Sequence, residues 1–161
     1  MNDLLQNEVR ILLHLAGKVE PAMLDYRPSP KQRSTIELLQ YLSMMGPTLI
    51  EHAKAGCFDP AAWTGAEKAA AARDFDQAVA VIAAQADTYA AMLGAMADSD
   101  LRAEIDMFGV RTSRGAHIVS GVLSGCAAYR TQLFLYLKAC GRTDLGTMNL
   151  WAGADAPAPK G

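Results

Sequence analysis

The chain has 161 residues, a formal net charge of −2, and 51% hydrophobic residues against 20% charged residues. This length and balance are typical of one globular domain with a single core, and they exclude a mainly disordered chain. The charge is nearly balanced and no block of basic residues occurs, so composition gives no reason to expect a nucleic acid as partner.

The sequence predicts a cytoplasmic location without a membrane partner. The N-terminus has no basic region followed by an apolar run, so no export signal is expected. The longest apolar zone, residues 117–137, contains Arg130 and Gln132, which argues against a membrane-spanning helix. An odd, unpatterned set of cysteines fits reduced thiols better than a disulfide framework; they are Cys57, Cys126 and Cys140.

Two helices are expected in the first third of the chain. Apolar residues recur at helical spacing over residues 3–19. The second expected helix, residues 34–56, has the clearest start, because Ser34 and Glu37 form a capping-box pattern. Gly56 suits a left-handed C-cap. The Gly46-Pro47 pair inside this helix is expected to kink it or to split it.

The remaining elements are less sharply bounded. Residues 57–73 are expected to form a loop with an alanine-rich stretch for which a helix remains an alternative. A third helix begins at Asp74 or Asp76 and ends near residue 98, and a connection with a little strand or irregular structure follows at 101–109. A fourth helix runs from about residue 112 to Gly141, with a core stripe of Val119, Val122, Cys126, Tyr129, Leu133, Tyr136 and Cys140.

Four long helices with at least one long connection predict an all-α fold, a four-helix bundle with a crossover. The bundle is expected to occupy residues 1–153 as a single domain, with Leu150 and Trp151 packing back onto it. Residues 154–161, rich in alanine and proline, are expected to be a flexible C-terminal tail.

Two motifs resemble those of the DinB/YfiT-like superfamily. The first is Ser34-x-x-Glu-Leu-Leu-x-Tyr-Leu42, and the second is Tyr129-Arg-Thr-Gln-Leu-x-x-Tyr-Leu-Lys-x-x-Gly141. Arg27-Pro28 and Asn149-Leu-Trp-Ala-Gly153 fit as well. The resemblance spans nearly the whole chain and implies an up-down-down-up bundle, with the long crossover between the second and third helices.

The resemblance also implies where a metal would lie. Typical members place one histidine in the second helix and two, four residues apart, in the fourth helix. Here the corresponding positions hold Tyr41, Gly125 and Tyr129. Neutral tyrosine is a poor ligand for a divalent metal and glycine offers no side chain, so we expect no metal at this place.

Two functions from different classes follow from these replacements. The first is a non-catalytic protein without cofactor that binds a small ligand or a partner, with a pocket lined by Tyr41, Gly125 and Tyr129. The family precedent and the apolar fourth helix indicate a homodimer. The alternative is an enzyme similar to the thiol-dependent transferases and isomerases of the superfamily, with an altered or relocated site for a divalent metal such as Ni²⁺ or Zn²⁺.

The relocated site would use His52 and His117. If the second and fourth helices are antiparallel, both histidines lie on the same side of Tyr41 and about 15 Å from it along the helices. Such a site needs a third ligand, for which Glu51 and Glu8 are the candidates. The competing interpretation is a pair of unrelated histidines near helix ends.

Overall fold

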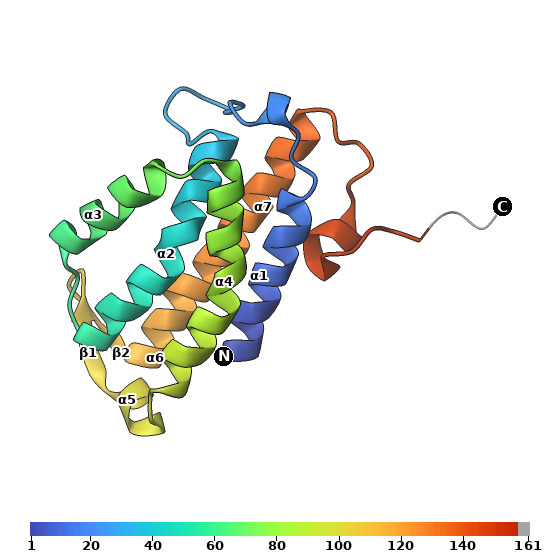
Figure 1. Ribbon diagram of the computed structural model, residues 1–161. Coiled ribbons are helices and arrows are strands. Elements are labelled where there is room, and N and C mark those ends of the chain that lie inside the picture. Colours follow the sequence, from blue (N-terminus) through green and yellow to red (C-terminus); the bar gives the residue numbers. More distant parts are fainter. Residues whose placement is uncertain (158–161) are drawn as a thin grey trace.

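In the computed structural model, which describes residues 1–157, four long helical runs form the bundle (Figure 1). They are α1 (Asn2–Ala16), α2 (Thr35–Ala55), α4 (Phe75–Gly94), and a composite run of α6 (Arg114–His117), a π-helical segment (Ile118–Leu123) and α7 (Ser124–Ala139). The first and last runs point up in Figure 1 and α2 and α4 point down. Both α1 and α2 pack against α4 and α7. The all-α, up-down-down-up bundle predicted from the sequence is therefore confirmed.

The start and end of α2 follow the predicted signals. The hydroxyl of Ser34 accepts a hydrogen bond from the Glu37 amide at 3.4 Å, and the Ser34 amide donates to the Glu37 carboxylate at 2.7 Å. Gly56 ends the helix with a φ of 76°. The predicted split at Gly46-Pro47 is not observed, because α2 runs through both residues as one helix.

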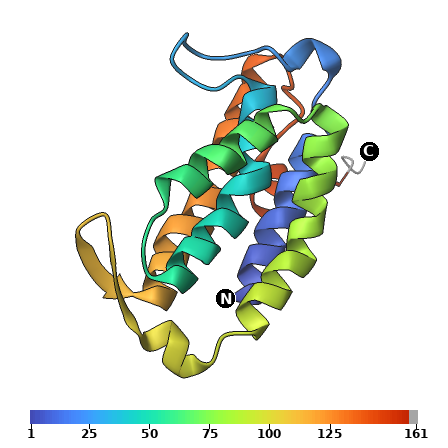
Figure 2. The same ribbon diagram turned by 60° about the vertical axis from the view of Figure 1, so that its left-hand side comes forward.

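The crossover between α2 and α4 contains α3 (Pro60–Ala71), so the alanine-rich stretch is helical. The carboxylate of Asp59 caps it by accepting hydrogen bonds from the amides of Ala61 and Ala62, at 2.8 and 3.1 Å. This helix packs on the outer side of α2 (Figure 2). A second capping box, Asp74 with Gln77, then begins α4.

The connection after α4 contains a short helix and two short strands; a strand was one of the two alternatives expected there. A short helix, α5 (Asp98–Arg102), leads into an antiparallel hairpin of β1 (Glu104–Met107) and β2 (Val110–Ser113). Ile105 and Met107 on β1 are buried and close one end of the bundle. Phe108, at the turn, is 68% exposed.

Two predictions about buried side chains are wrong. Val119 was expected in the core stripe and is 43% exposed, because the π-helical segment shifts the faces that the fourth helical run presents. Trp151 was expected to pack onto the bundle and is 68% exposed, with the Arg130 guanidinium carbon 5.6 Å from its ring.

The C-terminal segment turns back along α1. A π-helical turn at Met148–Ala152 places Asn149, which is buried, 3.0 Å from the Nε2 atom of His14. Asp155 accepts hydrogen bonds from Lys18 at 2.7 Å and Asn149 at 2.9 Å. Residues 158–161 of the predicted tail lie outside the described residues, and the boundary at residue 153 stays a prediction. Across residues 1–157, no helix has both the length and the apolar character that crossing a membrane requires.

Candidate functional site

The bundle brings Tyr41 and Tyr129 together at the seam between α2 and α7. Their ring centroids are 5.1 Å apart and the rings meet edge to face at 69°. Gly125 lies one turn before Tyr129 on α7, and a Cβ atom there would be 3.4 Å from both Sδ and Cε of Met45. The space beside Gly125 is therefore occupied by the Met45 side chain of α2.

Tyr41 is enclosed by two further groups from outside the helix seam. The Arg33 guanidinium carbon lies 3.8 Å from the Tyr41 ring centroid, a cation–π distance. Trp63 of α3 meets the opposite part of the ring at a centroid distance of 6.1 Å. Burial raises the pKa of Tyr41, and the neighbouring Tyr129 raises it further. The Tyr41 hydroxyl consequently stays neutral at physiological pH.

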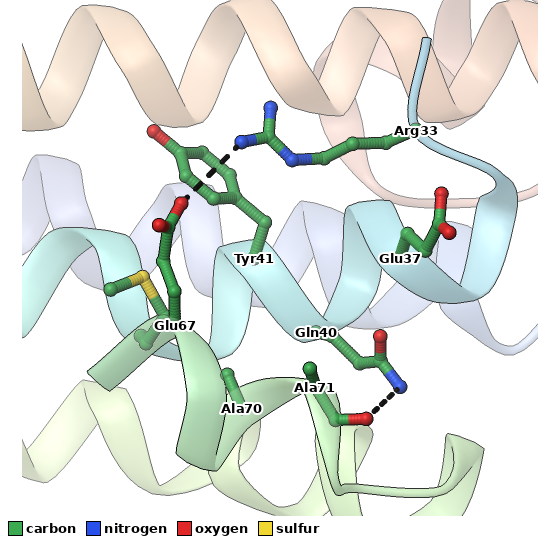
Figure 3. A pocket seen from close by; sticks show the side chains of 8 residues that line it. Arg33, Glu37, Gln40, Tyr41, Glu67, Ala70 and Ala71 are labelled. Atoms are coloured by element: carbon green, nitrogen blue, oxygen red, sulfur yellow. Dashed lines mark hydrogen bonds and ion pairs between the residues drawn. The ribbon is translucent and has the colours of Figure 1, made fainter. Parts of the chain in front are cut away.

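A cavity of about 200 Å³ opens beside Tyr41, between α2 and α3 (Figure 3). Its floor and walls are largely apolar, and its rim carries Arg33 and Glu67, whose charged groups are 3.8 Å apart. The amide of Gln40 donates to the carbonyl oxygens of Ala71 and Arg73 and ties α3 to α2. The lining residues are Arg33, Glu37, Gln40, Tyr41, Met44, Glu67, Ala70 and Ala71.

Of the predicted pocket residues, Tyr41 lines this cavity, whereas Gly125 and Tyr129 lie behind it in the seam. Arg33 and Glu67 were missed by the sequence reasoning. They lie 34 positions apart in different elements, and no local pattern links them. The one usable signal was that Arg33 precedes the capping box and so must lie near the first turn of α2.

Comparison with known proteins adds evidence on the fold. No protein-family model matches this chain, and no curated protein sequence matches it. Among solved structures, the chain is similar to a DinB-like protein from Bacillus subtilis, YjoA, with a TM-score of 0.69 and 16% sequence identity. The match covers 90% of this chain and 94% of that protein.

The fold is DinB-like. At 16% identity the likeness establishes the architecture, and function has to be argued from the site itself. The side chains at the α2–α7 seam do not fit the three-histidine metal site that the DinB-like resemblance implies. Two tyrosines and a glycine stand at its positions, and the Met45 side chain occupies the space beside the glycine.

The two histidines of the relocated metal site differ in burial, since His52 is buried and His117 is partly buried. His52 is 5% exposed, and its ring meets Phe58 edge to face at a centroid distance of 4.8 Å and lies 6.2 Å from the Trp63 ring. Both of its ring nitrogens are buried without a hydrogen-bond partner among residues 1–157. His117 lies beside Gly121 on its own helical run, and burial lowers its pKa.

The candidate third ligands are bound elsewhere. Glu51 pairs with Lys54 at 3.0 Å, and Glu8 pairs with Arg130 at 2.8 Å. Within residues 1–157, no three His, Cys, Asp or Glu side chains gather into a group that could hold a metal ion. The relocated site therefore lacks its third ligand in the described part of the chain.

Cys126 is an unsuitable nucleophile for a thiol chemistry at this seam. It is 8% exposed, and burial raises the pKa of its thiol to about 12, with the nearby Glu8 carboxylate adding to the rise. A thiol with such a pKa carries almost no thiolate at neutral pH. Cys126 therefore acts as a small buried hydrophobic side chain.

Proposed function

We propose that this DinB-like chain is a metal-free, non-catalytic protein that binds a small ligand in the cavity beside Tyr41. The observation that carries the proposal is the replacement of the metal-ligand positions by a packed Tyr41–Tyr129 pair, with an open cavity on the outer side of Tyr41. The neutral Tyr41 hydroxyl and the buried Cys126 thiol support a role in binding over a role in catalysis.

The cavity favours a small ligand with an apolar body and polar edges. Its volume of about 200 Å³ is below the range of about 300–1,000 Å³ for sites that hold drug-sized molecules. Tyr41 and Met44 offer apolar surface, while Arg33 and Glu67 offer one charge of each sign at the rim. A small molecule with both a donor and an acceptor group fits this arrangement.

Metal analysis tests the metal-free part of the proposal. We expect the purified, untagged protein to contain no stoichiometric metal and to show no melting shift with Ni²⁺, Zn²⁺ or Mn²⁺. As a positive control, Tyr41→His, Gly125→His and Tyr129→His are combined with Met45→Ala, which makes room for the new side chain at position 125. A regained site would stabilise the variant by about 4 kcal/mol at a thousand times its dissociation constant.

Stoichiometric metal in the unaltered protein would contradict the proposal and favour the thiol-dependent transferase or isomerase alternative. His52→Ala and His117→Ala variants would then show whether the metal lies at the relocated site. Unchanged metal content in both variants would place the metal at the tyrosines.

The ligand-binding part is tested with a library of small fragments, using ligand-observed NMR on the full chain. Ala71→Leu adds bulk to the cavity wall, and Ala72→Leu is the matched control at a neighbouring exposed alanine that does not line the cavity. We expect fragments that bind the unaltered protein and the control to lose binding to Ala71→Leu. Equal binding to both variants would contradict the assignment of the cavity.

We also propose that the protein is a cytoplasmic homodimer. Support comes from large apolar side chains exposed on the outer faces of the bundle, including Leu4 at 56% on α1 and Leu135 at 57% on α7. Sedimentation equilibrium across a wide concentration range tests it, with Leu4→Gln and Leu135→Gln as variants. A monomer at every concentration would contradict the dimer, and this outcome is independent of the ligand experiment.

A further inference from the structure

A second hollow lies on the other flank of α3 and shares Met44 with the lining of the Tyr41 cavity. Two adjoining cavities of about 500 and 440 Å³ share Pro47, Thr48 and Thr88 and form one groove with α2 as its floor. We call it the α3–α4 groove. Its lining residues are Ser43, Met44, Pro47, Thr48, Glu51, His52, Ala62, Ala66, Ala69, Arg73, Ala80, Val81, Ala84, Gln85, Thr88 and Met92.

The groove exists because alanines occupy much of the facing sides of α3 and α4. Ala62, Ala66 and Ala69 recur at helical spacing along one face of α3, and Ala80 and Ala84 do so on α4. Both helices pack on α2, and the methyl groups between them are too short to fill the space. The result is an elongated apolar surface that is open along its length.

Most polar groups inside the groove are hydrogen-bonded within the protein, but His52, at one end, has two buried ring nitrogens without a hydrogen-bond partner in the described part of the chain. The Gln85 amide donates to the Leu42 carbonyl at 2.8 Å. The hydroxyls of Thr48 and Thr88 donate to carbonyl oxygens of their own helices at 2.8 and 3.0 Å. Along most of its length the groove therefore offers a ligand apolar contact and little polar contact.

Arg73 supplies a charged group at the end of the groove opposite His52. One guanidinium nitrogen donates to the Ser43 hydroxyl at 2.6 Å, and among the ion pairs of residues 1–157 none involves Arg73. The only carboxylate that lines the groove is Glu51, which lies toward the opposite end and pairs with Lys54. The groove therefore has, at one end, a cation without a carboxylate partner among the described residues, and it has apolar side chains along its length. This arrangement complements an anion that carries an apolar chain.

We propose that the α3–α4 groove binds a medium-chain carboxylate, with the carboxylate on Arg73 and the alkyl chain along α2 toward Met92. The span from Ser43 to His52 along the floor is about 13 Å at 1.5 Å per residue, which suits an alkyl chain such as that of decanoate. This site is distinct from the Tyr41 cavity, because Glu67, Ala70 and Ala71 of α3 face that cavity and Ala62, Ala66 and Ala69 face the groove.

Isothermal titration calorimetry of the full chain with decanoate tests whether the end of the groove binds an anion. Decanol is the uncharged comparison, and decyltrimethylammonium is the cationic comparison. We expect one decanoate per chain, with decanol at least about tenfold weaker and the ammonium compound weaker still. Arg73→Gln should weaken decanoate by about tenfold and leave decanol unchanged. The matched control is Arg102→Gln on the exposed α5, which should leave both affinities unchanged.

A second pair of variants tests the position of the alkyl chain. Ala84→Leu places a larger side chain in the groove, and Ala83→Leu is its exposed neighbour outside the groove. We expect Ala84→Leu to lose decanoate binding and Ala83→Leu to keep it, with both variants folded by circular dichroism. Ala71→Leu, in the Tyr41 cavity, should also keep it, which separates this site from the proposed ligand site.

Four outcomes would overturn the proposal: no decanoate binding, equal affinity for decanoate and decanol, several decanoates per chain, or equal binding to the Ala84→Leu and Ala83→Leu variants. A change of oligomeric state in Ala84→Leu without decanoate binding would show that a second copy of the chain covers the groove instead.

Discussion

The Glu8–Arg130 pair allows a quantitative test of how the bundle is held together. The Arg130 Nε atom lies 2.8 Å from a Glu8 carboxylate oxygen, and their side chains are only 4% and 13% exposed. Arg130→Met keeps much of the apolar stem but leaves the Glu8 carboxylate buried without its partner. Breaking a buried ion pair from one side costs about 3–5 kcal/mol, so we expect a loss of this size in the free energy of unfolding at pH 7.

The loss should depend on pH in a defined direction. Burial raises the pKa of Glu8 even though Arg130 acts to lower it, so removal of Arg130 raises this pKa further. A carboxyl group whose pKa is raised by folding favours the folded state at low pH and loses that contribution as pH rises through the raised pKa. The Arg130→Met defect should therefore be smallest in acid and grow as pH rises through the raised pKa of Glu8.

Urea denaturation at several pH values measures both effects. In Glu8→Gln/Arg130→Met no buried carboxylate remains, so we expect this double variant to recover much of the lost stability at pH 7. Arg102→Met breaks the exposed pair with Asp98 and is the matched control, with no measurable change expected. A loss below about 1 kcal/mol at pH 7 that does not vary with pH would refute the reasoning.

Three further predictions concern single positions. Gly46→Ala would place a methyl group 1.9 Å from the Tyr89 hydroxyl oxygen, so the variant should lose about 1–3 kcal/mol to overpacking despite a helix-propensity gain of about 1 kcal/mol, as thermal melting will show. Ser34→Ala removes the N-cap of α2 and should cost about 1 kcal/mol in urea denaturation. A thiol reagent should modify the exposed Cys57 in the native protein and reach Cys126 only after denaturation, whereas rapid native labelling of Cys126 would contradict its burial.

Features that depend on neighbouring residues could be predicted from the sequence. The Ser34–Glu37 capping box and the left-handed Gly56 are set by contacts within a few residues of the chain, and both occur as expected. The meeting of Tyr41 with Tyr129 was also expected, because the DinB-like resemblance implies that the second and fourth helices bring these two positions together.

Features that depend on packing between elements were missed. The π-helical segment changes the face on which Val119 lies, and a strict helical period cannot show this. The alanine-rich α3 has no large apolar stripe, so the sequence did not reveal which of its flanks face α2. The sequence therefore could not show that Glu67 lies near Arg33. It also could not show that Ala66 lies opposite α4.

The position of α3 creates two of the hollows in this DinB-like fold. At the α2–α7 seam, Tyr129 and Trp63 enclose Tyr41 from two sides and Met45 fills the gap beside Gly125. The two hollows for which we propose ligands lie along the two flanks of α3, which is held to α2 by the hydrogen bonds of Gln40. A ligand reaches either hollow without entering the seam, so replacement of the metal ligands by tyrosines and binding on α3 are compatible in one structure.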